Sequence, residues 1–314
     1  MQRILTRGEI ETLDRTSVVR LISPMPDTFS TRAQRLRDLA TDNPIEDYLL
    51  LIAQLADAQQ QVFALDWSLT AIDESQLAQA QAHGMPPFSA SNIKRDATWR
   101  AMLSAILEQL LQQTTHSKPL PDAVRNNLVQ LADDINNKPE LIEQQADDLL
   151  NQKLEKIDAA RAPFIMAGLQ VYWSQLVAGL ESQKIPAHTP FGLCPCCGSQ
   201  PVSSTVMLGG PKEQIRYATC SLCSSQWHIV RVTCTHCEDT KKVAYHSLEE
   251  GSAGIKAESC DHCQHYRKIF YLDKEQFAEA FADDLASLPL DILMGEANFY
   301  RANNNPYFWQ AAEQ

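Results

Sequence analysis

The first 185 residues are dominated by apolar positions that recur every three or four residues, which is the spacing of one helix face. One run begins at Pro44, a residue that suits the first position of a helix, and continues to Leu65. Similar runs cover 99–111, 128–135 and 141–157. The pattern therefore predicts a bundle of helices.

Segment 164–180 is apolar on all sides, so we expect it to lie at the centre of this bundle. Tyr172 and Trp173 within it are interpreted as core residues. The acidic pairs Asp133–Asp134 and Asp147–Asp148 are interpreted as solvated helix faces, and not as catalytic carboxylates.

The periodicity changes after Pro186 and Pro190, which mark a linker. Short stretches rich in β-branched and aromatic residues then predict six strands, at 202–208, 215–219, 227–232, 243–248, 255–257 and 266–271. Helical spacing returns after residue 273. The aromatic end, 299–309, is expected to pack onto the strands, with a partner-binding tail as the alternative.

All nine cysteines lie between residues 194 and 263, and eight of them form four C-x-x-C pairs. The second two pairs repeat the first two at an offset of 40 residues. The candidate ligands are Cys194, Cys197, Cys220, Cys223, Cys234, Cys237, Cys260 and Cys263. Because the predicted strands follow the same period, the segment is interpreted as an internal duplication.

Four thiolates from two such pairs form a tetrahedral set, which suits Zn²⁺ or a single iron ion. We expect each repeat to bind its own ion, although an interleaved cross-brace and redox-active dithiols are alternatives. His236 and His262 lie inside two of the pairs, but we expect no histidine ligand because eight cysteines complete two sites. Cys196 is left over, either as a thiol without a role or as a sulfur carrier or redox sensor.

Charge argues against several functions. The chain has 39 acidic and 27 basic residues, for a net charge of −12, and residues 186–272 carry 8 basic and 7 acidic side chains. This balance disfavours nucleic-acid binding, which requires cations facing phosphates. No nucleophile–base arrangement, glycine-rich phosphate loop or open three-ligand metal site is present, so we expect neither catalytic nor cofactor-binding residues beyond the metal ligands and predict that the protein is not an enzyme.

The N-terminal region has seven arginines before Asp38, interspersed with acids. We interpret them as a solvated surface, with a basic contact arm as the alternative. Charged residues interrupt any signal-peptide core, and no apolar run reaches the roughly 20 residues that span a bilayer. We therefore expect a cytoplasmic protein without stable membrane insertion, in which thiols stay reduced.

These patterns predict a multi-domain α+β protein. It would comprise an α-helical domain (1–185), two tandem rubredoxin-like or zinc-ribbon-like four-cysteine domains (186–232 and 233–272) and a helical tail (273–314). Each ribbon is too short for a core of its own, so metal binding should supply most of its folding free energy. A chelator is therefore expected to unfold 190–272 and to leave the helical domain intact. The pattern does not predict the oligomeric state.

The chain resembles the FdhE family of bacterial formate dehydrogenase accessory proteins. The resemblance rests on the four cysteine pairs, the order of the domains and several local motifs. These motifs are Cys194-Pro-Cys-Cys-Gly-Ser-Gln-Pro201, Trp227 to Arg231, Asn43-Pro-Ile-Glu-Asp-Tyr-Leu49, Gln59-Gln-Gln61 and Leu290-Asp-Ile-Leu-Met294. It covers nearly the full length.

The resemblance implies a cytoplasmic assembly factor, needed for the activity of respiratory formate dehydrogenases, that contacts the catalytic subunit before export. It also implies rubredoxin-like iron sites in which the eight paired cysteines are the ligands. Only the first pair is followed by a glycine, Gly198, which leaves iron or zinc open. A zinc-ribbon nucleic-acid-binding protein and a general redox-sensitive chaperone are the alternative functions.

Overall fold

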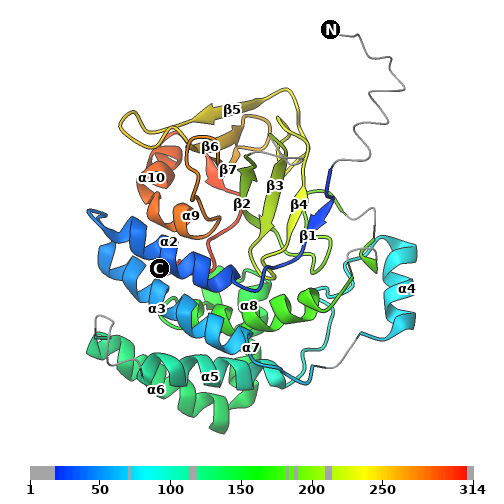
Figure 1. Cartoon of the computed structure of the whole chain (residues 1–314), viewed down its shortest axis with the longest axis vertical. Helices are drawn as coiled ribbons and strands as arrows, with labels where there is room; N and C mark the ends of the chain where they lie inside the picture. The colour runs from blue at the N-terminus through cyan, green and yellow to red at the C-terminus, as the bar shows by residue number, and fades with distance from the viewer. Residues whose placement is uncertain are drawn as a thin grey trace.

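A computed structural model of the chain describes residues 18–69, 72–112, 119–181, 184–186, 190–208 and 214–309. The architecture is α+β. A helical region lies against one end of a β-sheet, and the last helices of the chain cover part of the sheet (Figure 1).

The described helical region contains seven α-helices and one 3₁₀ turn. They are α2 (Thr28–Ala40), α3 (Glu46–Phe63), α4 (Glu74–His83), α5 (Thr98–Gln112), α6 (Asp122–Asn137), α7 (Pro139–Leu150), η1 (Leu154–Lys156) and α8 (Ala162–Ala178). The helices predicted from apolar spacing are present. Helices α2 and α4 were not predicted, because α2 has three arginines among its apolar positions and α4 buries only Leu77 and Ala80.

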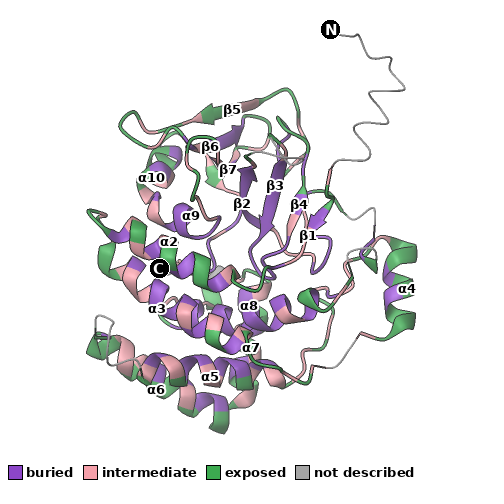
Figure 2. Cartoon of the chain, in the orientation of Figure 1, coloured by how far each residue is buried: buried purple, intermediate pink, exposed green. Residues whose placement is uncertain are grey.

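Helix α8 lies at the centre, as its composition predicted (Figure 2). Tyr172 and Trp173 are 3% and 0% exposed, which confirms that they are core residues. A Cβ at Gly168 would lie 2.8 Å from the Cβ of Leu103 in α5. The absence of a side chain at Gly168 therefore allows α5 and α8 to pack closely.

The interpretation of the acidic pairs as solvated faces is wrong for one member of each pair. Asp134 and Asp148 are 3% and 5% exposed. The Asp134 carboxylate accepts hydrogen bonds from Lys138 and Arg161, both at 2.8 Å. These ion pairs fix the ends of helices and lie outside any pocket with a candidate nucleophile.

One sheet contains both ribbons. Its strands are β1 (Leu21–Ile22), β2 (Pro201–Val206), β3 (Arg216–Cys220), β4 (Gln226–His228), β5 (Val243–His246), β6 (Ile255–Cys260), β7 (His265–Tyr271) and β8 (Tyr300–Arg301). The order is β1-β4-β3-β2-β7-β6-β5, and β8 pairs with β7. All six predicted strands form, although the third ends at His228. The parallel pairing of β2 with β7 joins the two repeats.

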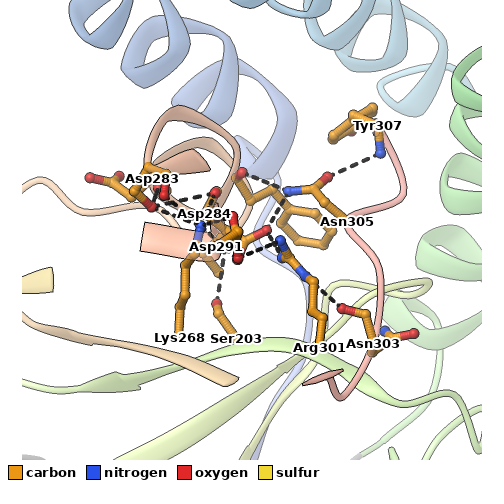
Figure 3. Close-up of polar contacts among 12 residues, drawn as sticks. Ser203, Lys268, Asp283, Asp284, Asp291, Arg301, Asn303, Asn305 and Tyr307 are labelled. Atoms are coloured by element: carbon orange, nitrogen blue, oxygen red, sulfur yellow. Dashed lines mark hydrogen bonds and ion pairs between the residues drawn. The ribbon is translucent and has the colours of Figure 1, made fainter. Parts of the chain in front are cut away.

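The tail contains α9 (Ala282–Ala286) and α10 (Leu288–Glu296) and is held by buried ion pairs (Figure 3). Lys268 of β7 contacts Asp291 at 2.6 Å, and Arg301 pairs with Asp284. The aromatic end also reaches the helical domain, where the Tyr307 hydroxyl donates to Gln59 at 2.7 Å. The expected packing onto the strands thus describes only part of its contacts.

Two arginines before Asp38 are not a solvated surface, contrary to our interpretation. Arg32 is fully buried, and its guanidinium contacts Glu279 at 3.2 Å. Arg35 pairs with buried Asp283 at 2.6 Å. Both arginines bind the tail to α2. The first three arginines of the chain lie in 1–17, outside the described residues.

Candidate metal centres

Each cysteine pair forms a tight turn of the same kind. In the first turn, the Gly198 amide donates to the Cys194 carbonyl at 2.8 Å, and the Cys194 amide donates to Ser199 at 2.9 Å. The third turn repeats both bonds, from Glu238 to Cys234 and from Cys234 to Asp239. This hydrogen bonding places both sulfurs of a pair on the same side of the loop.

The residue after every pair has a left-handed backbone. Its φ is +75° at Gly198, +56° at Ser224, +64° at Glu238 and +58° at Gln264. The sequence predicted this conformation only at the glycine, because side chains usually avoid positive φ. The geometry of the turn therefore does not separate the first pair from the other three.

The sulfur positions fit a tetrahedral metal ion. In the first group, Cys194 Sγ lies 3.5 Å from Cys223 Sγ, and Cys197 Sγ lies 3.3 Å from Cys220 Sγ. In the second, the Cys234–Cys263 and Cys237–Cys260 sulfurs are both 3.7 Å apart. Four sulfurs about 2.3 Å from one ion would lie about 3.8 Å apart, so little movement is needed for binding.

The grouping follows the sequence repeat. Cys194, Cys197, Cys220 and Cys223 form one group, and Cys234, Cys237, Cys260 and Cys263 form the other, each with its ligand atoms within 4.8 Å. Among the described residues neither group includes a histidine. His262 Nδ1 lies 3.5 Å from Cys237 Sγ, and His236 stacks on His265 with ring centroids 4.0 Å apart. The histidines therefore surround the second group without completing it.

The first group is enclosed by the main hydrophobic core of the protein, and its four cysteines are 0–1% exposed. The carbonyls of Cys196 and Cys197 accept hydrogen bonds from the amides of Phe88 and Ala90, both at 2.9 Å. Gln170 of α8 donates to the Ser221 carbonyl at 2.9 Å. The helical domain thus seals this site from solvent.

The second group is nearer to solvent. Cys260 is 1% exposed and Cys234 is 6% exposed, whereas Cys237 and Cys263 are only partly buried. The apolar cluster beside it has four fully buried members, Ala257, Tyr266, Leu290 and Met294. The two duplicated sites therefore have different surroundings.

The pKa values of individual thiols differ within each group as well as between the groups. Burial raises the pKa of the Cys194 thiol well above its ordinary value. At Cys237, burial also raises the pKa, but hydrogen bonds from His262, the Asp239 amide and neighbouring thiols lower it to about 7. Thiolates are the metal-binding form, so Cys237 ionises more readily than Cys194 in the metal-free protein.

Cys196 is fully buried and lies beside the first group. Its contact with Cys194 lowers the pKa of its thiol, whereas its contact with Cys223 and its burial raise it, and the net shift is upward. A buried thiol with a raised pKa is a poor nucleophile. These surroundings favour the interpretation of Cys196 as a thiol without a chemical role over that of a sulfur carrier or redox sensor.

Sequence reasoning missed the residues that hold the two sites together. Arg216 of the first repeat donates to the Thr233 carbonyl at 3.2 Å and to the Glu258 carboxylate at 2.7 Å. A Cβ at Gly192 would meet the Thr235 carbonyl oxygen at 2.3 Å. The turn that carries Cys234 is therefore packed against the first ribbon. Charged residues in otherwise apolar strands were the only sequence signal for this contact.

Two four-cysteine ribbons within one sheet, closed by a helical domain and a helical tail, define a class of double-ribbon protein. Family models match consecutive parts of the chain: FdhE, N-terminal, at 19–189; FdhE, central domain, at 193–231; and FdhE, C-terminal domain, at 232–308. The chain belongs to the FdhE family.

Individual relatives agree with this assignment. A protein named as an FdhE homolog from Serratia proteamaculans is 40% identical over 292 residues, covering 92% of this chain and 90% of the relative. One from Yersinia enterocolitica is 38% identical over 293 residues, with the same coverage. The crystal structure of the FdhE protein from Pseudomonas aeruginosa matches with a TM-score of 0.78 and 36% identity, covering 92% of this chain and 99% of that one.

In the part of the chain that the structure describes, no helix is both long enough and apolar enough to cross a bilayer.

Proposed function

We propose that this chain is an accessory factor required for the activity of respiratory formate dehydrogenase. It would bind the catalytic subunit of that enzyme in the cytoplasm, before export. The observation that carries the proposal is the match of FdhE models to all three parts of the chain, from residue 19 to residue 308.

The eight paired cysteines would hold two metal ions, one in each repeat, as zinc or as rubredoxin-like iron. The sulfur spacing of 3.3–3.7 Å supports this assignment. Backbone amides also point at the sulfurs: Cys223 N donates to Cys220 Sγ at 3.3 Å, and His236 N donates to Cys234 Sγ at 3.4 Å. Such bonds stabilise thiolates.

Closed sites suit a binding role better than a catalytic one. Four sulfurs complete a tetrahedral metal ion and leave no position for a substrate, whereas catalytic zinc keeps one position open. We therefore propose that the protein is not an enzyme. Nucleic-acid binding is disfavoured by the net charge of −12, and Arg216 and Lys268 of the ribbon strands are buried in ion pairs.

A pull-down from the cells of origin, combined with metal analysis, tests both parts of this proposal. We expect the purified full chain to contain two metal ions and to retain the catalytic subunit of formate dehydrogenase. The variant Ile292→Asp, which alters a surface residue that is 63% exposed on α10, would show whether the tail contributes to binding. Absence of any formate dehydrogenase subunit from the wild-type sample would contradict the proposed partner, and absence of metal would contradict the proposed sites.

A further inference from the structure

Five cationic side chains are buried among the described residues, and four of them pair with a carboxylate. Arg32 pairs with Glu279, Arg161 with Asp134, Arg216 with Glu258 and Lys268 with Asp291. The fifth, Arg267 of β7, is 3% exposed. Its Nε donates to the neutral Thr235 hydroxyl at 2.9 Å, and its Nη1 has no hydrogen-bond partner among the described residues. A buried cation without a directly paired carboxylate is costly.

The carboxylate nearest along the sheet does not neutralise Arg267. Glu258 lies opposite Arg267 in the β6–β7 register, but both of its oxygens bind Arg216, at 2.7 and 3.0 Å, and one also accepts from Tyr245. The group formed by Arg216, Glu258 and Arg267 therefore keeps one net positive charge.

The excess charge lies beside the second cysteine group. Thr235, which accepts the hydrogen bond from Arg267, lies inside the Cys234–Cys237 turn. Arg267 and Cys234 line the same small cavity, of about 10 Å³, which leaves little room for water between them. Burial and the neighbouring Arg216 and Arg301 lower the pKa of Arg267 to about 9, whereas the charges of Cys234 and Asp284 raise it. The guanidinium therefore lies beside the turn that carries Cys234.

The first repeat shows that the ribbon fold does not need a cation at this place. Trp227 pairs with Ala218 in β3–β4 as Arg267 pairs with Glu258 in β6–β7, 40 residues later in both strands. Trp227 is 7% exposed and neutral. At this strand position, an arginine is therefore present in the second repeat and not in the first.

We infer that Arg267 is the counter-cation of the second four-cysteine site. Four thiolates around a divalent ion leave a net charge of about −2, and the buried guanidinium would offset part of it. Arg267 would then act as a positioning and charge-balancing residue, which strengthens metal binding at the second site without contributing a ligand. This inference rests on the proposed metal sites.

The test uses the full chain loaded with ¹¹³Cd²⁺, because each four-sulfur site then gives its own NMR signal. Cys237→Ser identifies the signal of the second site. Arg267→Met removes the charge and keeps an apolar stem, Arg267→Lys keeps the charge, and Thr235→Val removes only the hydrogen bond. Chelator competition then gives the cadmium affinity of each site in each variant.

We expect Arg267→Met to weaken the second site by about tenfold or more, which corresponds to the loss of one nearby charge, and to leave the first site unchanged. Arg267→Lys and Thr235→Val should stay within about threefold of the wild type, since both retain a cation. In iron-loaded protein, Arg267→Met should also lower the reduction potential of the second site, because a cation favours the more negative ferrous form.

Two outcomes would overturn the inference while leaving the metal sites in place. The first is an unchanged second-site affinity in Arg267→Met. The second is an equal loss in Arg267→Met and Arg267→Lys, including failure of both variants to fold around the second site, which would show that Arg267 acts by shape and not by charge. A wild-type chain with no second cadmium signal would instead contradict the proposed second site itself.

Discussion

The residue that follows each cysteine pair shows how a local conformation can be shared by different side chains. All four such residues have a positive φ, although only one is glycine. The cost of about 1–2 kcal/mol for an L-residue in this conformation is accepted at three positions because the turn directs two sulfurs to one point. The four cysteine pairs therefore share one turn geometry.

The energetic cost of the positive φ can be measured by replacing glycine at one turn and introducing it at another. Gly198→Ala should destabilise the metal-loaded chain by about 1–2 kcal/mol, because it introduces a Cβ at φ +75°. Glu238→Gly, at an exposed residue with φ +64°, should be neutral or stabilise the chain by up to about 1 kcal/mol. Chemical denaturation of the zinc-loaded variants measures both effects. Equal destabilisation by the two changes would argue against a common turn.

Cys196 and Cys197 are adjacent buried thiols with different proposed roles. Cys196→Ala should keep two metal ions per chain and cost about 1 kcal/mol of stability through lost packing. Cys197→Ala should lose one ion, since it removes a ligand from the first group. Metal analysis after gel filtration gives both results. Loss of an ion from Cys196→Ala would assign that thiol to the site.

At the scale of elements, the two ribbons repeat the same strands, but their cysteines differ in exposure to solvent. The cysteines of the first belong to the hydrophobic core that includes α8, whereas the second packs against the short tail helices. The sequence repeat predicts equal ligand sets but not this difference, which depends on the elements that cover each ribbon.

A chelator should therefore remove the metal of the second site before that of the first. We expect the second-site ion to leave at least about tenfold faster, because Cys237 and Cys263 are partly open to solvent and the first group is sealed. Stopped-flow transfer of zinc to a coloured chelator should show two phases of equal amplitude. If the fast phase remains in the Cys237→Ser variant, it belongs to the first site, and the predicted order is wrong.

Most of the helices and strands can be predicted from the sequence. Apolar spacing predicts the helices that bury a continuous face, such as α3 and α5, and β-branched and aromatic composition predicts all six ribbon strands. Helix α2 was not predicted because the buried Arg32 and the partly buried Arg35 lie where spacing rules expect apolar residues. Their partners lie more than 230 residues away, so no local pattern could indicate that these charges are neutralised.

The candidate site could likewise be predicted only in part. Spacing gives the eight cysteines and their assignment to two groups, because the ligand sets are local within each repeat. The contacts of Arg216 and Gly192 with the third turn depend on the pairing of β2 with β7, which brings the repeats together. The chain sequence alone does not specify which edges of the two ribbons meet.

At the scale of the whole molecule, the tail links the second ribbon to the helical domain. Lys268, Asp291 and Arg301 join β7 to the tail (Figure 3), and Arg35 joins the tail to α2 through Asp283. The Asp283 side chain is fully buried. Helical domain, ribbons and tail therefore form one packed unit in the described chain, and we now expect loss of the first metal ion to loosen α8 as well as the ribbon.

Two arginines of α2 test the strength of this link. Arg35→Ala should destabilise the chain by about 3 kcal/mol, because it leaves the buried Asp283 carboxylate without its cation. Arg37→Ala should cost less than about 1 kcal/mol, since Arg37 and its partner Asp57 are 39% and 32% exposed. Thermal or urea unfolding compares the two. A similar small effect for both would show that the tail does not depend on Arg35.

The central claim is that the chain supports formate dehydrogenase through its two four-cysteine sites. Formate dehydrogenase activity should be measured in the cells of origin after deletion of the gene for this chain. We predict that activity is lost, that the wild-type chain and Cys196→Ala restore it, and that Cys197→Ala does not. Unchanged activity after deletion, or full rescue by chains that lack both metal sites, would contradict it.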